Sequence, residues 1–358
     1  MTTSRIVKPV ALAAVAVLLA LVPYTWFPGF GLLPDYTGAA GSLSLLSKVM
    51  IMAALAVTFD LLLGQSGLMS FGHVLYFGVG AYAFAMLLAY TSLTFWVAAA
   101  LTVLLTAGLS LLLSLVALRV ENIAYSMVTL AFAQVGAVAV ARNYFGTGGE
   151  SGLRLPTEKI PALFVGLQNT PNVYWFSLAT LAVVVTAAAL VVRSRFGLSL
   201  RGTRDNALRM RVLGYNVYGL RLAVSVVAST LAGLCGVAYV VTIGGTDPDA
   251  VGLMLALSLI FMVVIGGSGS LVGAAIGGTV YAFLDMRLPA VGDGLDAGSV
   301  PPLVAHLLGE PDLLLGVIFL IVVFVAPKGI VGIAEAAVAK VRARRAGPLR
   351  VVLEEDFR

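Results

Sequence analysis

The sequence predicts an all-α integral membrane protein, a polytopic bundle of about ten spans whose helices include discontinuous, glycine-rich ones. Composition is the first observation. The 358 residues are 60% hydrophobic and 11% charged, with a mean hydropathy of +1.03, which is far from the balance of a soluble domain. The second observation is that apolar runs of about 20 residues, the length that crosses a bilayer as a helix, recur along the chain. These runs lack the alternation of a membrane β-barrel.

The apolar runs set the expected spans. They lie at 9–28, 43–64, 71–91, 93–118, 122–141, 173–192, 221–243, 250–266, 270–289 and 312–327. The first run also resembles a signal peptide, because Arg5 and Lys8 precede it. No small-x-small cleavage pattern follows, however, and Tyr24–Phe27 is typical of an interfacial aromatic belt, so we expect an uncleaved helix. Gly266–Ser270 divides the stretch 250–289 into two spans or interrupts a single discontinuous one.

Positive charge predicts the orientation. If both termini lie in the cytoplasm, 17 of the 22 Lys and Arg residues fall in inner segments and 4 in outer ones, and Lys48 falls within a span. This excess favours an N-in, C-in topology, and an even number of spans agrees with it. We expect one transmembrane domain over 1–340, followed by a cytoplasmic tail at 341–358 that is first basic and then acidic.

A cytoplasmic loop at 193–220 lies within the most basic stretch of the chain. Seven arginines occur between residues 193 and 221, against the single acid Asp205. Within the loop, the pattern predicts a short helix over 203–214. Thr203 or Asp205 would cap its start, and Gly214 would take the left-handed conformation after its end.

The apolar side of this helix suggests a binding role. Leu208, Val212 and Tyr215 share one helical face. A helix of about ten residues, roughly 15 Å long, is too short to span the bilayer. We expect it to lie against the membrane or to dock into a groove on a partner. The alternative is a positively charged loop that only fixes the orientation.

Enzyme chemistry is not supported by the motifs. His73 and His306 are the only histidines, and Cys235 is the only cysteine, so we expect no catalytic residue, no metal site and no internal disulfide. The chain also lacks the glycine-rich loop that cradles phosphates. If ATP drives any step, another subunit must bind it. The pI of about 9.4 reflects basic loops, and we expect no nucleic-acid partner.

Four segments together resemble a known family. They are TFDLLLGQSGLMSFGHVLYFGVGAYAFAML (58–87), FGLSLRGTRDNALRMRVLGYNVYGLRLAVSVVASTLAGLCGVAYV (196–240), VVIGGSGSLVGAAIGGTVY (263–281) and APKGIVGI (326–333). They resemble, in the same order, segments of bacterial branched-chain amino acid ABC importer permeases of the LivM type. The resemblance extends over most of the chain.

The resemblance implies a role for the basic loop. In that family it corresponds to a coupling motif that fits a cleft on the ATP-binding subunit. The positions carried over are Arg201, Arg204, Asp205, Asn206, Leu208, Arg211, Leu213 and Gly214. Many relatives carry Glu where this chain has Ala207, and small alanines where it has Arg209 and Met210. These departures bear on which ATPase the loop accepts.

The resemblance also implies an assembly and a location. We expect a multi-pass protein of the bacterial inner membrane, paired with a second homologous permease, two ATP-binding cassette subunits and a periplasmic substrate-binding protein. No cofactor would bind to this chain, and ATP and Mg would bind to the partner subunits. Leu, Ile and Val are the default cargo, with urea or short amides as alternatives.

The glycine-rich stretches then become candidates for lining a translocation path. Broken helices can line a polar cavity, and a charge within a span is functional by default. The candidate residues are Asp60, Gly64, Gln65, Ser66, Gly67, Ser70, Gly72, His73, Phe77, Gly78, Gly267, Ser268, Gly269 and Ser270. Close helix packing through small residues would explain the same glycines without a path.

A second class of function stays open at this point. An ion-coupled secondary transporter would use Asp60, Lys48 or His73 as coupling groups. Such a protein would need an ion gradient and no ATPase.

Overall fold

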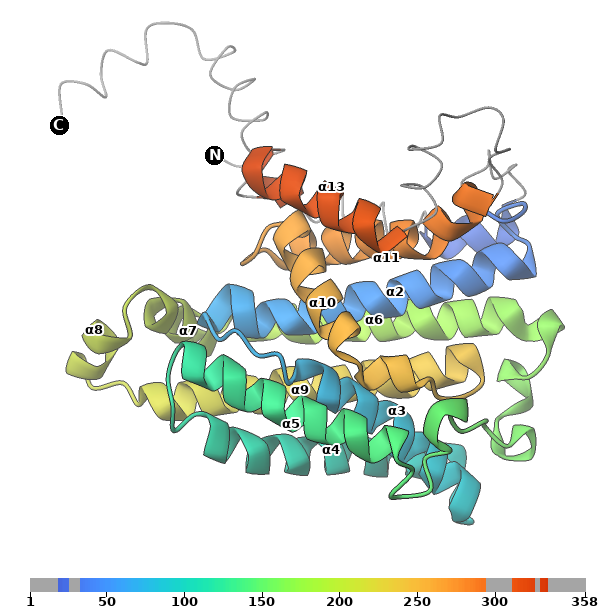
Figure 1. Ribbon diagram of the computed structural model, residues 1–358, viewed down its shortest axis with the longest axis horizontal. Helices are drawn as coiled ribbons and strands as arrows, with labels where there is room; N and C mark the ends of the chain where they lie inside the picture. Colours follow the sequence, from blue (N-terminus) through green and yellow to red (C-terminus); the bar gives the residue numbers. More distant parts are fainter. Residues whose placement is uncertain (1–18, 26–32, 294–310, 326–328, 334–358) are drawn as a thin grey trace, which may run out of the picture.

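A computed structural model describes residues 19–25, 33–293, 311–325 and 329–333. Within these residues every regular element is a helix, and Arg154 and Gly245 form an isolated β-bridge. The longer helices are α2 (Ala40–Asp60), α3 (His73–Tyr90), α4 (Phe95–Ala117), α5 (Ile123–Ala141), α6 (Thr170–Arg193), α7 (Arg195–Asp205), α9 (Val217–Ile243), α10 (Leu253–Gly266), α11 (Leu271–Asp293) and α13 (Pro311–Val325) (Figure 1). The shorter ones are η1 (Val22–Tyr24), the π-helical η2 (Leu61–Ser66), η3 (Gly149–Ser151), η4 (Thr157–Lys159), η5 (Ala162–Phe164), η6 (Leu167–Asn169), α8 (Ala207–Val212) and η7 (Pro248–Val251).

The predicted fold class, a helical membrane protein, is confirmed. Within the described residues, eight helices are long and apolar enough to cross a bilayer, and each coincides with an expected span. The expected span at 250–266 is the 14-residue α10, which is shorter than the others. Most of the expected first span, 9–28, and the whole tail, 341–358, lie outside the described residues. The total of ten spans and the cytoplasmic side of the termini stay predictions.

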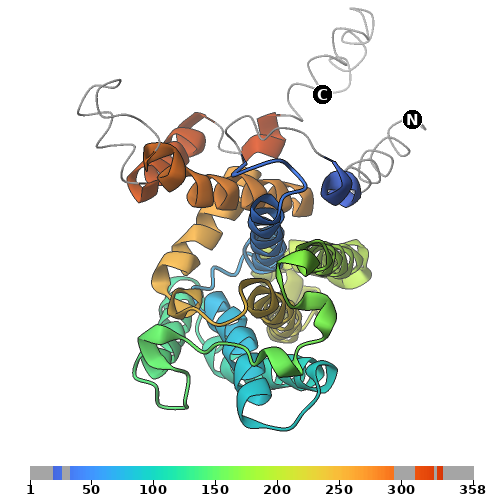
Figure 2. The ribbon, with the colours of Figure 1, turned by 90° about the vertical axis from the view of Figure 1, so that its right-hand side faces the viewer.

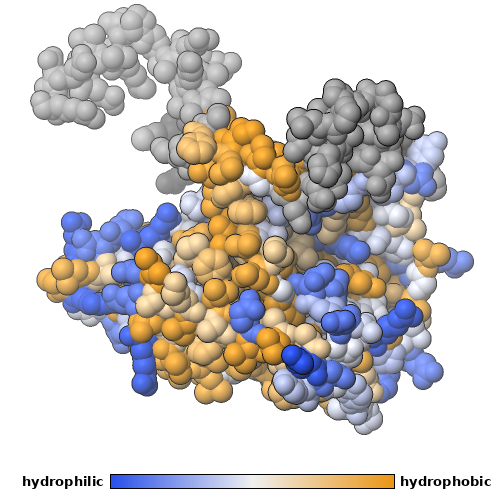
Figure 3. All heavy atoms as spheres, in the orientation of Figure 1, coloured by the Kyte–Doolittle hydropathy of each residue, from blue (hydrophilic) through white to orange (hydrophobic). Residues whose placement is uncertain are grey.

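Helix α2 lies in the middle of the bundle, in contact with α6, α9, α10 and α11 (Figure 2). Apart from Lys48 and Asp60, its residues are apolar or small around the whole circumference, and from Val49 to Asp60 all of them are buried. A helix without a polar face is buried on all sides. By contrast, α4 and α5 lie at the edge of the bundle and expose many apolar side chains. Apolar side chains cover the middle of one face, and hydrophilic ones gather at the end formed by α7 and α8 (Figure 3).

The central helices approach closely because small residues line their contacts. On α3 and α9, a Cβ placed on Gly80 would lie 2.6 Å from the Gly233 Cα, and a Cβ on Gly236 would collide with the Phe77 carbonyl oxygen. Packing of this kind replaces the hydrophobic effect as a cause of association within lipid. Ser114 and Ser225 add a hydrogen bond of 2.8 Å between α4 and α9.

The contact between α3 and α9 gives a first prediction. Gly236→Leu should prevent the two helices from packing, because its Cβ meets backbone that has no room to move. The matched control is Gly108→Leu on α4, where a Cβ would have no neighbour within 4 Å. Size-exclusion chromatography in detergent should show loss of monodisperse protein for Gly236→Leu alone. Equal yields of the two variants would contradict this packing.

Candidate functional site

Two helix breaks face each other near the α7 end of the bundle. Helix α2 continues into the π-helical turn η2 and stops at Gly67, which has a φ of +71°. The second break separates α10 from α11, and there Gly269 has a φ of +92°. Side chains with a Cβ rarely adopt such a conformation. A Cβ on Gly64 would collide with the nitrogen of Gly269, so the two breaks lie in direct contact.

Side chains from the first break satisfy the backbone of the second. The Gly269 N–H donates to Asp60 Oδ1 at 2.7 Å, and Gln65 Nε2 donates to the Gly269 carbonyl at 2.9 Å. Asp60 and Gln65 are almost completely buried. Backbone groups that a helix break sets free need such partners in an apolar setting. The predicted candidates Asp60, Gly64, Gln65 and Gly269 therefore lie together.

An arginine from α7 joins the same cluster. Arg204 Nη1 donates to the Gly64 carbonyl oxygen, and a Cβ on Gly269 would lie 2.9 Å from the same nitrogen. The aliphatic stem of Arg204 packs on Gly67. We call Asp60, Gly64, Gln65, Gly269 and Arg204 the glycine junction. It connects α7 to both helix breaks.

The basic loop forms two helices and not the single helix predicted over 203–214. Helix α7 already begins at Arg195, capped by Ser194, and it contains both predicted capping residues. Thr203 is buried and donates to the Ser199 carbonyl at 2.9 Å, and Asp205 is the last residue of α7. The cap of α8 is Asn206, whose Oδ1 accepts from the Arg209 N–H at 2.8 Å. An Asn side chain that accepts a hydrogen bond from the backbone N–H three residues later starts a new helix and separates it from the one before.

The end of α8 and its contact with α7 fix the shape of this hairpin. Gly214 has a φ of +84°, as predicted for the residue after the helix. Met210 is buried, and its Sδ would lie 2.9 Å from a Cβ on Gly202 of α7. Helix α8 is therefore held against α7 by the Met210 side chain, which fits only because residue 202 is a glycine.

Four apolar side chains at the tip of α8 are exposed. The exposed fractions are 69% for Leu208, 80% for Val212, 65% for Leu213 and 48% for Tyr215. We call these four residues the docking tip. Two arginines of the hairpin have partners within the chain: Arg201 donates to the Val192 carbonyl, and Arg211 pairs with Glu121.

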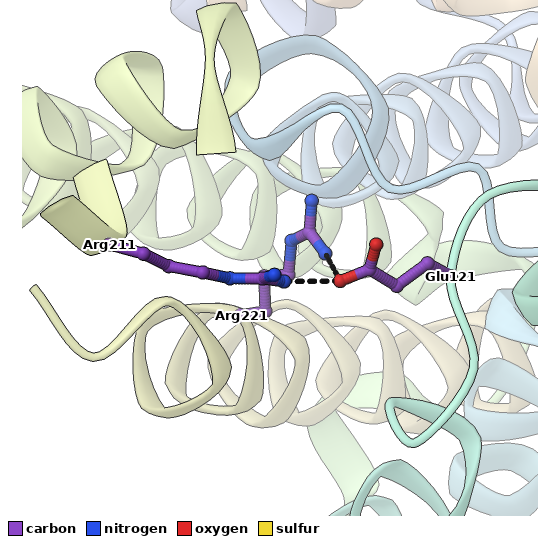
Figure 4. Close-up of polar contacts among 3 residues, drawn as sticks. All are labelled: Glu121, Arg211 and Arg221. Carbon is purple, nitrogen blue, oxygen red and sulfur yellow. Dashed lines mark hydrogen bonds and ion pairs between the residues drawn. The ribbon is translucent and has the colours of Figure 1, made fainter. Parts of the chain in front are cut away.

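Glu121 is a contact residue that the sequence analysis missed. It lies in the turn between α4 and α5, where it binds Arg211 of α8 and approaches Arg221 of α9 to 3.7 Å (Figure 4). One signal was available, because Glu121 is the only acid between residues 118 and 122. An isolated acid in a chain so rich in arginine would have been a reason to look for an ion pair.

The other candidates from the first glycine-rich stretch lie apart from the junction. His73 is buried and bonds to Thr58 Oγ1 at 2.9 Å. The Thr58 hydroxyl already donates its hydrogen to the Leu55 carbonyl, so His73 Nε2–H is the donor in the bond between His73 and Thr58. A Cβ on Gly72 would crowd Thr129, and one on Gly78 would crowd Val251.

The remaining candidates have local partners or lie at the breaks. Ser66 donates to the Leu62 carbonyl, Ser70 is buried, and the Phe77 ring packs against Tyr239. In the second break, Gly267 lies against Gly329, Ser268 is exposed, and Ser270 Oγ accepts from the Gly273 N–H. These contacts are those of close packing. A lining role for the whole set of path residues stays a prediction.

Comparison with known proteins places the chain in a family. The family profile described as "Branched-chain amino acid transport system / permease component" matches residues 41–326. The chain belongs to this permease family. It is therefore a multi-pass permease of the ABC transporter class, as the sequence resemblance implied.

Curated relatives of the permease carry two kinds of name. The "High-affinity branched-chain amino acid transport system permease protein LivM" of Salmonella typhimurium and that of Escherichia coli are each 25% identical over 252 residues, which is 64% of this chain and 59% of theirs. The "Autoinducer 2 import system permease protein LsrC" of Escherichia coli is 27% identical over 232 residues, 58% of this chain and 67% of that protein. The match thus spans about three fifths of LivM.

A solved structure is also similar. It is "PsaBC from Streptococcus pneumoniae in complex with Fab", at 14% identity and a TM-score of 0.42, with 80% of this chain and 91% of that chain covered.

The close contacts at the glycine junction predict the effect of a substitution at Gly64. Gly64→Ala should lower the stability of the permease by about 1–3 kcal/mol, because a methyl group there meets both Asp60 and the Gly269 backbone. The control is Gly41→Ala at the start of α2, where a Cβ makes an ordinary contact of 3.9 Å; there the stability should stay the same or rise slightly. Thermal unfolding in detergent measures both. A midpoint for Gly64→Ala that equals that of Gly41→Ala would rule out the tight junction.

Proposed function

We propose that this permease is a membrane subunit of an ABC importer of the bacterial inner membrane, which moves branched-chain, hydrophobic amino acids or a related small solute into the cell. Separate subunits would bind ATP and Mg and supply the energy. The observation that carries the proposal is the contact of Arg204 with Gly64. Through it, the cytoplasmic helices reach the helix breaks within the bundle.

The docking tip is the proposed contact with the ATP-binding subunit. A short helix with exposed Leu208 and Val212 fits a groove on a partner, where the apolar side chains leave water. The helix is held in place from behind, since Met210 packs on α7 and Arg211 pairs with Glu121. A fixed helix loses less conformational entropy on binding than a mobile loop.

The α7–α8 hairpin would transmit movement of the ATPase to the membrane. Closure of the ATP-binding subunits displaces the docking tip, and the contact of Met210 with Gly202 makes α7 follow. Arg204 then pulls on the Gly64 carbonyl and shifts the two breaks relative to each other. Breaks are the points at which a packed helix changes direction at least cost, so this shift would switch the path between outward-facing and inward-facing states.

The cargo and the other partners are proposed on the family and its relatives. LivM is named for branched-chain amino acids and LsrC for autoinducer 2, and the match to LivM leads us to favour the amino acids. A second homologous permease would complete the path, and a periplasmic binding protein would deliver the cargo. Ligand screening of the binding protein encoded beside this permease tests the cargo. Binding of urea, short amides or a sugar-like ligand, and of no branched-chain amino acid, would reject it.

A reconstitution experiment separates this function from ion-coupled transport. The complete transporter in liposomes should accumulate cargo only with ATP and the binding protein. The purified permease alone should not transport under a proton or sodium gradient. Uptake by the permease alone, driven by either gradient, would reject the ABC mechanism in favour of a secondary transporter.

The docking tip can be tested with matched variants at the two ends of the molecule. Leu208→Glu with Gly214→Val should abolish co-purification of the ATP-binding subunit and uptake, and should leave membrane insertion intact, because it places a charge and a strained backbone at the tip. The control is Leu167→Glu with Gly166→Val. Leu167 is 82% exposed and Gly166 has a φ of +91°. Both precede α6, whose start lies at the opposite end of the bundle from α8 (Figure 1). Retained ATPase binding by the tip variant would show that the tip is not the contact.

Transmission through Arg204 predicts a different phenotype. Arg204→Gln should keep ATPase co-purification and lower uptake per ATP hydrolysed by roughly tenfold, the effect of losing about 1.4 kcal/mol of coupling free energy. Arg195→Gln, which removes the same charge from an exposed position of α7, should behave as the unmodified permease. Simultaneous measurement of uptake and hydrolysis in liposomes gives this ratio. An unchanged ratio for Arg204→Gln would remove Arg204 from the mechanism.

A further inference from the structure

A cavity of about 480 Å³ lies between the α4–α5 turn, the end of α8 and the start of α9. The polar groups that matter in its lining are Arg119, Arg211, Arg221, Glu121 and Tyr218. It is separate from the glycine junction, because none of the junction residues lines it. It shares Tyr215 with the docking tip and the Arg211–Glu121 pair with the support of α8, but the proposed transport function gives no role to Arg119, Arg221 or the space between them.

The charges around the cavity do not balance. Three guanidinium groups, those of Arg119, Arg211 and Arg221, line the cavity with the single carboxylate of Glu121, which binds Arg211 and is 3.7 Å from Arg221. The Arg221 Nε is buried without a hydrogen-bond partner among the described residues, and no ion pair of Arg119 is found among them. The positive end of α9 also points here, since that helix begins at Val217. A second anion would relieve this excess.

The position of the cavity indicates where such an anion comes from. Helix α4 ends at Ala117 and α9 begins at Val217, so the cavity lies at the level where two spans leave the membrane. Apolar residues that lie two positions from lining residues in the sequence are exposed, including Val116 at 54% and Ile123 at 74%. Such exposed side chains offer an apolar surface for acyl chains on the same two segments, α4 and α5, that flank the cationic recess.

We infer that this cavity binds the phosphate of an anionic membrane phospholipid, with Arg119 and Arg221 as its main ligands. Guanidinium groups bind phosphate oxygens through paired, charge-assisted hydrogen bonds, and basic pockets between spans hold anionic headgroups. Glu121 competes with the phosphate for Arg211 and Arg221. On the predicted orientation, the lipid belongs to the cytoplasmic leaflet. The inference goes beyond the proposed transport function and does not depend on it.

The purified full-length permease in detergent tests the site directly. The probes are dioctanoyl phosphatidylglycerol, dioctanoyl phosphatidylcholine and inorganic phosphate, each titrated at constant ionic strength while the thermal unfolding midpoint is measured. A ligand that binds only the folded state raises that midpoint in a saturable way. Phosphatidylglycerol should do so, and phosphatidylcholine and inorganic phosphate should not.

Variants assign the response to the cavity. Arg119→Gln with Arg221→Gln should weaken the apparent affinity for phosphatidylglycerol at least tenfold. Arg193→Gln with Arg195→Gln removes the same charge from exposed positions outside the cavity and should leave the affinity unchanged. Glu121→Gln should raise the affinity, because it removes the competing carboxylate. That increase is an effect that a purely structural role of Glu121 does not produce.

Four outcomes would overturn the inference. Equal responses to the two lipids would remove the need for an anionic headgroup. Saturation by inorganic phosphate would assign the site to free phosphate and not to a lipid. An equal loss in the Arg193 and Arg195 control would reduce the effect to net charge. If the variant at Arg119 and Arg221 does not fold, Glu121→Gln decides, and a loss of lipid affinity in Glu121→Gln would reject the site.

Discussion

The structure depends on how the backbone is satisfied where two helices break at the α7 end of the bundle. Gly269 has no helical partners for its N–H and carbonyl, and Asp60 and Gln65 supply them. The Gly64 carbonyl lies in a π-helical turn and accepts a hydrogen bond from Arg204. Because these hydrogen bonds join three separate elements, the two breaks and α7 hold each other in one arrangement. Helix α7 is thereby in direct contact with the ends of two membrane-spanning helices.

This arrangement also explains how the positive charge of the loop is used. Arg204 of α7 reaches the glycine junction, and Arg211 of α8 reaches Glu121. Asn206 separates the two helices, so each arginine belongs to a different rigid segment. The hairpin is thus attached to the bundle at two points, one on each side of Asn206. Charges that favour one side of the membrane also hold the element that lies there.

The sequence predicted the local features of this protein and missed those that depend on distant contacts. The eight long spans followed from apolar length, and the left-handed Gly214 followed from its place after a helix. The helix start was misplaced because Thr203 and Asp205 are as good at capping as Asn206, and only packing decides between them. Gly64 and Gly269 are in contact although they lie 205 positions apart in the sequence, and no local pattern predicts such a pair. Arg204 and Asp60 were identified as candidates, but their shared neighbours were visible only in three dimensions.

The exposed tip of α8 has a consequence for how the cell must make this protein. A free copy presents Leu208, Val212, Leu213 and Tyr215 to water next to one another. Contiguous apolar surface of this kind drives self-association when its partner is missing. If an ATP-binding subunit covers the tip, as proposed, a permease made in excess of that subunit would be prone to aggregation and to removal by quality-control proteases. Matched synthesis of the two subunits would then serve solubility as well as transport.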